Sequence, residues 1–322
     1  MKVLVVADPL EALQDETDTT LYWSKICLEA GAEIWWAEAQ DLSWFGDHLR
    51  IQASSCELDE KGRLKAGEIE SFSILKTRFD WIWLRKEPPY DFSYLKMCWR
   101  LSHLTGGGAR FLNSPESLLL FPEKEIPLYL VSRAILQPDN ILMTCISDLA
   151  EEQIRFVQEQ SSDFFICKPW DSFAGKGVRR LTREELLQEI ESRRIDSGSI
   201  LQVYNPSVES RGDRRVLILD GRILGSFVRV PQKGGFLANL VHGASLEFSE
   251  MSEREEAIAN KLAAWTQVAG LHFIGADLIG ERLNEVNTTC PTGLLALEKL
   301  SGRSQKQLWR DFFFNKKNGA RL

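Results

Sequence analysis

The sequence predicts a protein of mixed α/β and α+β class, in which a doubly wound parallel sheet is followed by two α+β regions. Over residues 1–121, short apolar runs alternate with helical patterns, which is typical of βαβ units with helices on both faces of a sheet. From Phe121 to Tyr204, short strands and polar helices replace this alternation, and two long strands joined by a tight turn follow. The length of 322 residues suggests about two domains.

The N-terminal region contains the clearest strand and helix signals. Each expected strand is a short run of apolar residues, and each expected helix is followed by glycine. The expected strands are Lys2–Ala7, Ala32–Ala37 and Asp80–Leu84, and the expected helices are Thr17–Ala30 and Ser93–Leu104. The loops Asp8-Pro9 and Arg85–Pro89 follow two of these strands, so we expect them at the carboxyl edge of the sheet, where ligand sites form.

The middle and C-terminal regions carry different patterns. We expect polar helices near Asp148–Glu159 and Thr182–Arg193, long strands at Arg214–Asp220 and Arg222–Val230, and an amphipathic helix at Ser252–Val268. The long strands meet at Asp220-Gly221, a signal for a tight hairpin turn. Ser252 is expected to cap its helix, because Glu255 follows three residues later.

Composition excludes several classes of function. The net charge of -7 argues against a nucleic-acid partner, because such proteins usually present a basic surface. No apolar run suits a signal peptide or a membrane span, so we expect a cytoplasmic protein with no membrane partner. The six cysteines form no CxxC pair, and the four histidines lack partners at metal-ligand spacing, so no zinc site is expected.

The segment Phe273–Asn287 is the sharpest candidate for a metal site. We interpret it as two strands joined by a three-residue turn at residues 280–282, which would place Asp277 opposite Glu285. Asn287 lies two residues further on and would face the same side. Two carboxylates and an amide oxygen are hard ligands that suit Mg²⁺. The alternative interpretation is a solvated polar face on an ordinary hairpin.

The segment Asp163–Leu181 is a candidate phosphate site. An apolar strand presents Lys168 at its end, and the loop Asp171–Gly177, rich in small residues, follows it. Successive N–H groups in such a loop can cradle phosphate. The P-loop pattern is absent, and an ordinary hairpin loop is the alternative interpretation.

Two arginines lie on the long strands of the C-terminal region. Pairing of these strands about Asp220-Gly221 would leave Arg215 and Arg229 near the same distal end. There they could clamp a phosphoryl group or a carboxylate. The alternative interpretation is a pair of surface cations on a half-exposed sheet.

Taken together and in this order, these segments resemble the prokaryotic glutathione synthetases, members of the ATP-grasp superfamily. The resemblance runs over almost the whole chain. Its motifs are Ala7-Asp8-Pro9, Leu84–Asp91 (LRKEPPYD), Leu112–Leu118 (LNSPESL), Glu123-Lys124, Lys168–Gly177 (KPWDSFAGKG), Gly212–Gly221 (GDRRVLILDG), Arg229–Gly235 (RVPQKGG), Gly275–Asn287 (GADLIGERLNEVN) and Pro291-Thr292.

The resemblance implies an ATP-grasp fold of three parts. These would be an N-terminal substrate-binding domain at residues 1–121, a central lid domain at 122–204 and a C-terminal catalytic domain at 205–322. It also implies an ATP-dependent ligase that joins γ-glutamylcysteine to glycine through an acyl phosphate. Its partners would be small-molecule substrates, and a homo-oligomer is suggested.

The resemblance assigns roles to particular residues. The implied ATP-binding residues are Lys124, Lys168, Ser172, Ala174, Gly175, Gln202, Val203, Tyr204 and Asn205. The two lysines would contact phosphates, and backbone groups of residues 202–205 would hold adenine. The implied ligands of two Mg²⁺ ions, with Mn²⁺ as the alternative metal, are Asp277, Glu285 and Asn287. Arg215 and Arg229 would stabilise the acyl phosphate, and Arg85 and Lys86 would hold the acidic substrate.

The sequence departs from the family pattern at three places near the amine end of the implied cleft. Asp171–Gly175 replaces a glycine-rich lid, and leucine replaces an expected arginine at Leu237 and again at Leu295. Two alternatives therefore stay open. One is a paralogous ligase that joins a different acid and amino acid or peptide. The other is a non-catalytic nucleotide-binding protein, against which the intact Asp277, Glu285 and Asn287 set argues.

Overall fold

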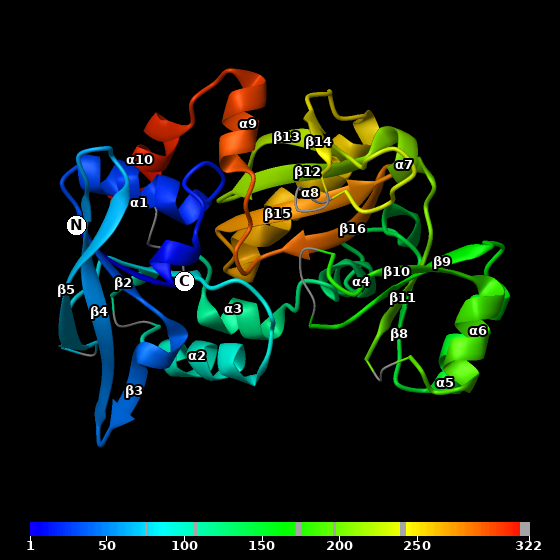
Figure 1. Ribbon diagram of the computed structural model, residues 1–322, viewed down its shortest axis with the longest axis horizontal. Helices are drawn as coiled ribbons and strands as arrows, with labels where there is room; N and C mark the ends of the chain where they lie inside the picture. The colour runs from blue at the N-terminus through cyan, green and yellow to red at the C-terminus, as the bar shows by residue number, and fades with distance from the viewer. Residues whose placement is uncertain (75, 106–107, 172–174, 196–197, 239–242, 316–322) are drawn as a thin grey trace.

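The computed structural model describes residues 1–74, 76–105, 108–171, 175–195, 198–238 and 243–315. Within these residues, three sheets of seven, four and five strands follow one another along the chain. Figure 1 shows the first sheet on the left, the five-stranded sheet in the centre and the four-stranded sheet on the right. None of the helices in the described ranges has the length and apolar character that crossing a membrane requires.

The centre of the first sheet is parallel, as the strand–helix alternation predicts. β1 (Lys2–Ala7) lies between β2 (Glu33–Ala37) and β6 (Trp81–Arg85), and β7 (Arg110–Phe111) continues the parallel order. The helix after β1 is α1 (Thr19–Glu29), which Asp18 caps. These bounds agree with the predicted ones to within two residues, so Asp8 and Arg85 lie at the carboxyl edge of the sheet.

An antiparallel extension of this sheet was not predicted. β3 (Leu42–Phe45), β4 (His48–Leu58) and β5 (Leu64–Ser73) add to the edge beside β2. Residues 65–71 of β5 are exposed throughout, so this part of the strand has no apolar face. Without that face, the sequence lacks the alternation by which a half-buried strand is recognised.

The four-stranded sheet forms a small unit with its own core. Its strands, in spatial order, are β10 (Arg179–Thr182), β9 (Phe164–Lys168), β11 (Ile200–Val203) and β8 (Thr144–Ile146). The polar helices predicted for this region are α5 (Ala150–Glu159) and α6 (Arg183–Glu191). They bury Val157 and Leu186 against Phe165 and Leu201 of the sheet.

The five-stranded sheet carries the two predicted hairpins. Its strands, in spatial order, are β14 (Ser245–Glu247), β13 (Arg222–Val230), β12 (Asp213–Leu219), β15 (Phe273–Ile279) and β16 (Arg282–Asn287). The other elements are η1 (Leu10–Ala12), η2 (Ala39–Asp41), α2 (Phe92–Ser102), α3 (Pro115–Leu120), α4 (Ile126–Ser132), η3 (Pro138–Asn140), α7 (Ser207–Arg211), α8 (Glu253–Ala269), α9 (Leu294–Ser301) and α10 (Lys306–Phe314).

The β15–β16 turn is shorter than predicted, yet the predicted pairing holds. Gly280 and Glu281 alone form the turn, with φ of 56° and 62°, so both occupy the left-handed region of a type I′ hairpin. A bulge then shifts the register between Asp277 and Leu278, and this shift places Asp277 opposite Glu285. The expected three-residue turn is therefore corrected to a two-residue turn plus a bulge.

An aromatic cluster joins the first and third sheets. Trp23 of α1 packs against Trp309 of α10 at a ring-centroid distance of 4.5 Å and against Phe273 of β15 at 5.1 Å. The indole N–H of Trp81 donates to the Phe313 carbonyl at 2.9 Å. All of these side chains are fully buried. Residues from both sheets thus share one hydrophobic core.

We predict that Trp309→Ala lowers the free energy of unfolding by about 3–5 kcal/mol, because it leaves a large cavity in this shared core. Urea unfolding followed by circular dichroism measures the change. Trp99→Ala is the control: this tryptophan is 45% exposed, and its loss should cost less than about 0.5 kcal/mol. Equal losses in the two variants would contradict the structural role of the cluster.

Candidate active site

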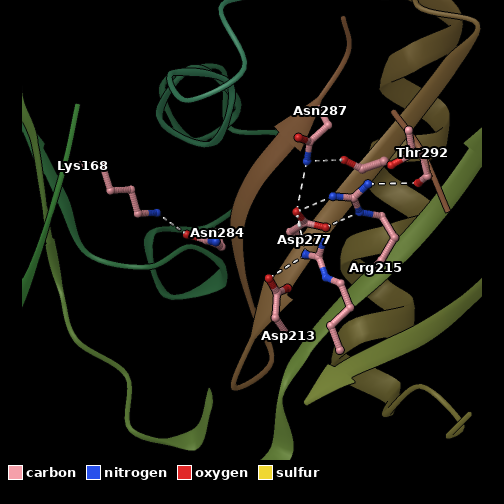
Figure 2. Close-up of polar contacts among 9 residues, drawn as sticks. Lys168, Asp213, Arg215, Asp277, Asn284, Asn287 and Thr292 are labelled. Atoms are coloured by element: carbon pink, nitrogen blue, oxygen red, sulfur yellow. Dashed lines mark hydrogen bonds and ion pairs between the residues drawn. The ribbon is translucent and has the colours of Figure 1, made fainter. Parts of the chain in front are cut away.

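Asp277 lies at the centre of a buried charge cluster on the five-stranded sheet. The guanidinium of Arg215 binds its carboxylate through Nε and Nη2, the latter at 2.8 Å (Figure 2). Arg229 Nη2 lies 2.9 Å from Oδ2 of the same carboxylate. Arg229 also pairs with Asp213 at 2.6 Å. The four side chains are between 2% and 10% exposed. Two cations and two carboxylates thus meet away from solvent.

Strand register produces this cluster. Arg215 on β12 is directly opposite Asp277 on β15, and Asp213 on β12 is directly opposite Arg229 on β13. Directly paired residues, and residues two apart on one strand, point to the same face of a sheet. The prediction that Arg215 and Arg229 lie near the same end of the paired strands is therefore confirmed.

The cluster perturbs both carboxylates, in opposite directions. Burial opposes ionisation of Asp277, yet Arg215 and Arg229 together lower the pKa of its carboxyl to about 2. Burial raises the pKa of the Asp213 carboxyl to about 7. The Arg229 charge lowers this pKa but offsets only part of the effect, because the negative charge of Asp277 raises it further. The two arginines therefore favour the ionised form of Asp277, whereas burial favours the protonated form of Asp213.

Glu285 and Asn287 extend the cluster onto β16. Asn287 Nδ2 donates to Asp277 Oδ2 at 3.1 Å, and Glu285 makes no ion pair with any residue the structure describes. In Figure 2, the amide oxygen of Asn287 points away from Asp277. These side chains fit a divalent cation by their chemistry, because all three offer hard oxygens on one face.

The protein alone does not preassemble a complete metal cage. Within the described ranges, no group of three or more His, Cys, Asp or Glu side chains could hold a metal ion. The Asp277, Glu285 and Asn287 set supplies two carboxylates and one amide. A cation bound there would need further oxygen ligands. Mg²⁺ ordinarily takes such ligands from phosphates and water.

Lys168 reaches this hairpin from the four-stranded sheet. Its Nζ donates to Asn284 Oδ1 at 2.8 Å, and Asn284 is the extra residue of the β16 bulge. Burial lowers the pKa of Lys168, while the carboxylates of Glu285, Asp213 and Asp277 oppose that shift. The structure therefore brings the predicted phosphate ligand beside the predicted metal ligands.

The Lys124 side chain contacts the backbone just before the predicted lid loop, Asp171–Gly177. Its Nζ donates to the carbonyls of Pro169 and Trp170 at 2.7 and 2.8 Å, directly before that loop. Burial lowers the pKa of Lys124, and among the neighbouring carboxylates the charge of Glu285 opposes this shift most strongly. Of the predicted loop ligands, Ser172 and Ala174 lie outside the described residues. Gly175 lies in a turn with φ of 77°.

The predicted adenine-binding segment connects the four-stranded sheet to the five-stranded sheet. The N–H groups of Val203 and Tyr204 donate to Met143 and Phe164 carbonyls at 2.9 and 3.1 Å. The Gln202 amide donates to Thr144 Oγ1 at 3.0 Å, and the Asn205 amide to the Ile279 carbonyl at 3.4 Å.

Arg85 and Lys86 lie outside the Asp277 cluster, at the carboxyl end of β6. Lys86 pairs with Asp8 at 2.7 Å, and its side chain is 23% exposed. Arg85 is 2% exposed and donates to the Pro291 carbonyl at 2.9 Å. The predicted acidic-substrate ligands therefore occupy different environments, one half-buried and one enclosed.

Sequence reasoning assigned no role to three supporting residues, although each lies in one of the quoted family motifs. Glu123 Oε1 accepts from the N–H groups of Thr288 and Thr289 at 2.6 and 2.8 Å. Asn113 Nδ2 donates to the Thr288 carbonyl at 2.6 Å. Asp213, the third, lies two residues before Arg215, and that spacing on a strand was the available signal. Burial raises the pKa of the Glu123 carboxyl. The hydrogen bonds from Thr288 and Thr289 lower it, and so they partly offset the cost of enclosing this charge.

Comparisons with known proteins identify relatives over nearly the full length. Two family models match: the N-terminal domain of prokaryotic glutathione synthetase over residues 1–118 and its ATP-grasp domain over residues 134–302. The chain is 33% identical over 304 residues to a glutathione synthetase of Parasynechococcus marenigrum (strain WH8102), which covers 93% of this chain and 94% of that protein. A glutathione synthetase of Prochlorococcus marinus subsp. pastoris (strain CCMP1986 / NIES-2087 / MED4) is 30% identical, with 94% and 96% coverage.

Solved structures with the same fold include a synthetase and an ATP-grasp ligase. D-cycloserine synthetase DcsG aligns with a TM-score of 0.65 at 16% identity, over 98% of this chain and 99% of that one. The ATP-grasp ligase PsnB, complexed with minimal precursor, Mg and ADP, aligns with a TM-score of 0.62 at 17% identity, over 99% and 98%. At such identities the likeness shows the fold, and the predicted ATP-grasp fold is confirmed.

We predict that Asp277→Asn lowers the free energy of unfolding by about 3–5 kcal/mol, because it leaves two buried arginines without their shared carboxylate. Glu285→Gln is the matched control on the opposite residue. It should change stability by less than about 0.5 kcal/mol, since no ion pair to a described residue is lost. Thermal and urea unfolding of both variants measure this. A small loss in Asp277→Asn would argue against the charge cluster.

Proposed function

Because this chain belongs to the prokaryotic glutathione synthetase family, we propose that it joins γ-glutamylcysteine to glycine. The chain is an ATP-dependent ligase that uses a divalent metal. The substrates are proposed from the similarity to named glutathione synthetases. The observation that carries the phosphoryl-transfer part of the proposal is the cluster of Arg215, Arg229 and Asp277, with Glu285 opposite Asp277. It provides paired cations for a transferring phosphoryl group beside oxygen ligands for a metal.

We propose that Asp277, Glu285 and Asn287 hold the metal, taken as two Mg²⁺ ions with Mn²⁺ as the alternative. When bound, the metal would neutralise phosphate charge in the cleft. The proposed nucleotide site runs from residues 202–205, for adenine, to Lys124 and Lys168, for the phosphates. The proposed division into units at 1–121, 122–204 and 205–322 places this site between the second and third.

The proposed reaction begins with attack of a substrate carboxylate on the terminal phosphoryl group of ATP. A carboxylate O–P bond forms to give an acyl phosphate, and the P–O bond to ADP breaks so that ADP leaves. Both groups are anionic, so the step depends on cations that offset their repulsion. In our proposal Lys168 holds the phosphate end, and Arg215 and Arg229 stabilise the charge that develops on the transferring group. The acyl phosphate is then attacked by an amine, a C–N bond forms, and phosphate leaves as the amine loses a proton.

The proposed acid-substrate site lies at the carboxyl edge of the first sheet. Lys86 is the cation there whose side chain reaches solvent, and Asp8 holds it at 2.7 Å. An anionic substrate would be attracted to this ammonium. The site carries both a cation, Lys86, and a nearby carboxylate, Asp8, and it therefore fits the proposed peptide-like acid substrate.

The amine end supports a second candidate, a paralogous ligase with another amine substrate. Leu237 and Leu295 are both half-buried, and Leu295 lies two residues after Gly293, which packs against Arg215. Leucine has no hydrogen-bond donor for a carboxylate. Arg303 is a poor replacement for a cation at Leu295, because it follows the far end of α9, about 12 Å along the helix axis.

We predict that Lys168→Ala weakens ATP binding about ten- to hundredfold, because a phosphate loses its charged partner. Isothermal titration calorimetry with a non-hydrolysable ATP analogue and Mg²⁺ measures the dissociation constant. Asn284→Ala is the matched control, since it removes the same Lys168–Asn284 hydrogen bond and keeps the ammonium. If both variants bind the nucleotide like the unchanged protein, Lys168 has a structural role.

The substrate proposal is tested by ADP release with a panel of acids and amines. We expect γ-glutamylcysteine to be the best acid. For glycine we expect a KM about ten- to hundredfold above the range of ordinary enzymes, since a charged hydrogen bond worth about 1.5–3 kcal/mol is missing. Leu295→Arg should lower that KM, and Leu300→Arg, further along α9, is the control. A different amine with a much higher kcat/KM would favour the paralogous ligase.

A further inference from the structure

Arg85 is anchored on three sides at the end of β6. Its Nε donates to Thr20 Oγ1 at 3.0 Å, and its Nη2 donates to the Pro291 carbonyl at 2.9 Å. The guanidinium carbon lies 4.8 Å from the centre of the Trp23 ring. Trp23 is fully buried in the aromatic cluster, and Arg85 is 2% exposed. This side chain therefore cannot move toward a ligand without disturbing the core.

The residues after Pro291 connect Arg85 to the charge cluster. The Thr292 carbonyl, one peptide further along, accepts from Arg215 Nη1 at 3.1 Å (Figure 2). Gly293 has φ of 111°, and a Cβ there would lie 2.8 Å from the Phe227 ring. The same Cβ would lie 3.8 Å from Arg215 Cγ. The backbone of residues 291–293 is thus packed directly against Arg215.

We propose that Arg85 is a positioning residue that holds the 291–293 backbone, so that the Thr292 carbonyl fixes the guanidinium of Arg215. This inference rests on the proposed role of Arg215 at the transferring phosphoryl group, and it replaces the proposed role of Arg85 as a ligand of the acidic substrate. Asp277 holds two nitrogens of Arg215, and Thr292 holds the third. Release of the third contact removes the link between the Arg215–Asp277 pair and the 291–293 backbone, so that the guanidinium can shift away from its target.

The two roles of Arg85 predict different kinetics. In Arg85→Gln we expect kcat to fall about 100-fold, the cost of a misplacement of about 1 Å at a reacting group. KM for ATP and for the acidic substrate should stay unchanged, because ground-state binding is not touched. A direct substrate ligand would instead raise KM for the acidic substrate. A raised KM with unchanged kcat overturns the proposal.

Arg110 provides a matched control on the same sheet. Its guanidinium carbon lies 4.2 Å from the Trp81 ring centre, and it donates to the carbonyls of Phe313 and Asn315 at 3.2 and 3.1 Å. It lies at the opposite end of β6 from Arg85, since Trp81 pairs with Arg110. Arg110→Gln therefore removes the same kind of contact, and we expect it to lower stability with kcat unchanged. An equal fall of kcat in both variants overturns the proposal.

A double-mutant cycle with Arg215→Lys tests the connection itself. If Arg85 acts through Arg215, Arg85→Gln should cost little further kcat in the Arg215→Lys background. If the two substitutions instead lower kcat independently, so that their fold-changes multiply in the double variant, the proposal is overturned. Full kcat in Arg215→Lys alone would instead refute the proposed role of Arg215. If Arg85→Gln does not fold, Thr20→Val removes the Nε acceptor, and we expect about a tenfold fall in kcat. An unchanged kcat in Thr20→Val counts against the proposal.

Discussion

The ion pairs between Asp277 and the two arginines depend on a single constraint, the register of three adjacent strands. Arg215 and Asp277 are directly paired across β12 and β15, and Asp213 and Arg229 across β12 and β13. A slip of one residue would turn these charges to the other face, into the core beneath α8. Both hairpins fix the register in the same way. Each has a two-residue turn with positive φ and then a bulge.

The cluster is held in place because segments from the first sheet, the five-stranded sheet and the loop between α3 and α4 hold its neighbours. Residues 288–293 connect β16 to α9, and they are held at one end by Glu123 and Asn113 and at the other by Arg85 and Arg215. The four contacts come from elements far apart in the sequence. Preorganised donors cost no reorganisation when charge develops in a reaction. The aromatic core between the first and third sheets therefore supports the charge cluster as well as overall stability.

Much of the fold could be predicted because its strands and helices obey local rules. The Asp277–Glu285 pairing followed from spacing, although the turn is one residue shorter and a bulge restores the alignment. β5 could not be recognised, since residues 65–71 are exposed on both faces. The environment of Arg85 could not be predicted from the sequence either, because Trp23 and Pro291 contact it from distant parts of the chain. Motif resemblance identified an important arginine, whereas its burial emerged only from tertiary packing.

The phosphoryl and amine ends of the proposed site are carried by physically different structures. The charged residues lie on paired strands, where each substitution disturbs a register partner or leaves a buried charge. Leu237 lies in an irregular segment and Leu295 at the start of α9, where side chains change without breaking the ladder of β12, β13 and β15. Loops on a rigid scaffold tolerate such variation. A chain of this family can therefore keep its phosphoryl chemistry while its amine preference changes, and the two leucines lie where that change is least costly.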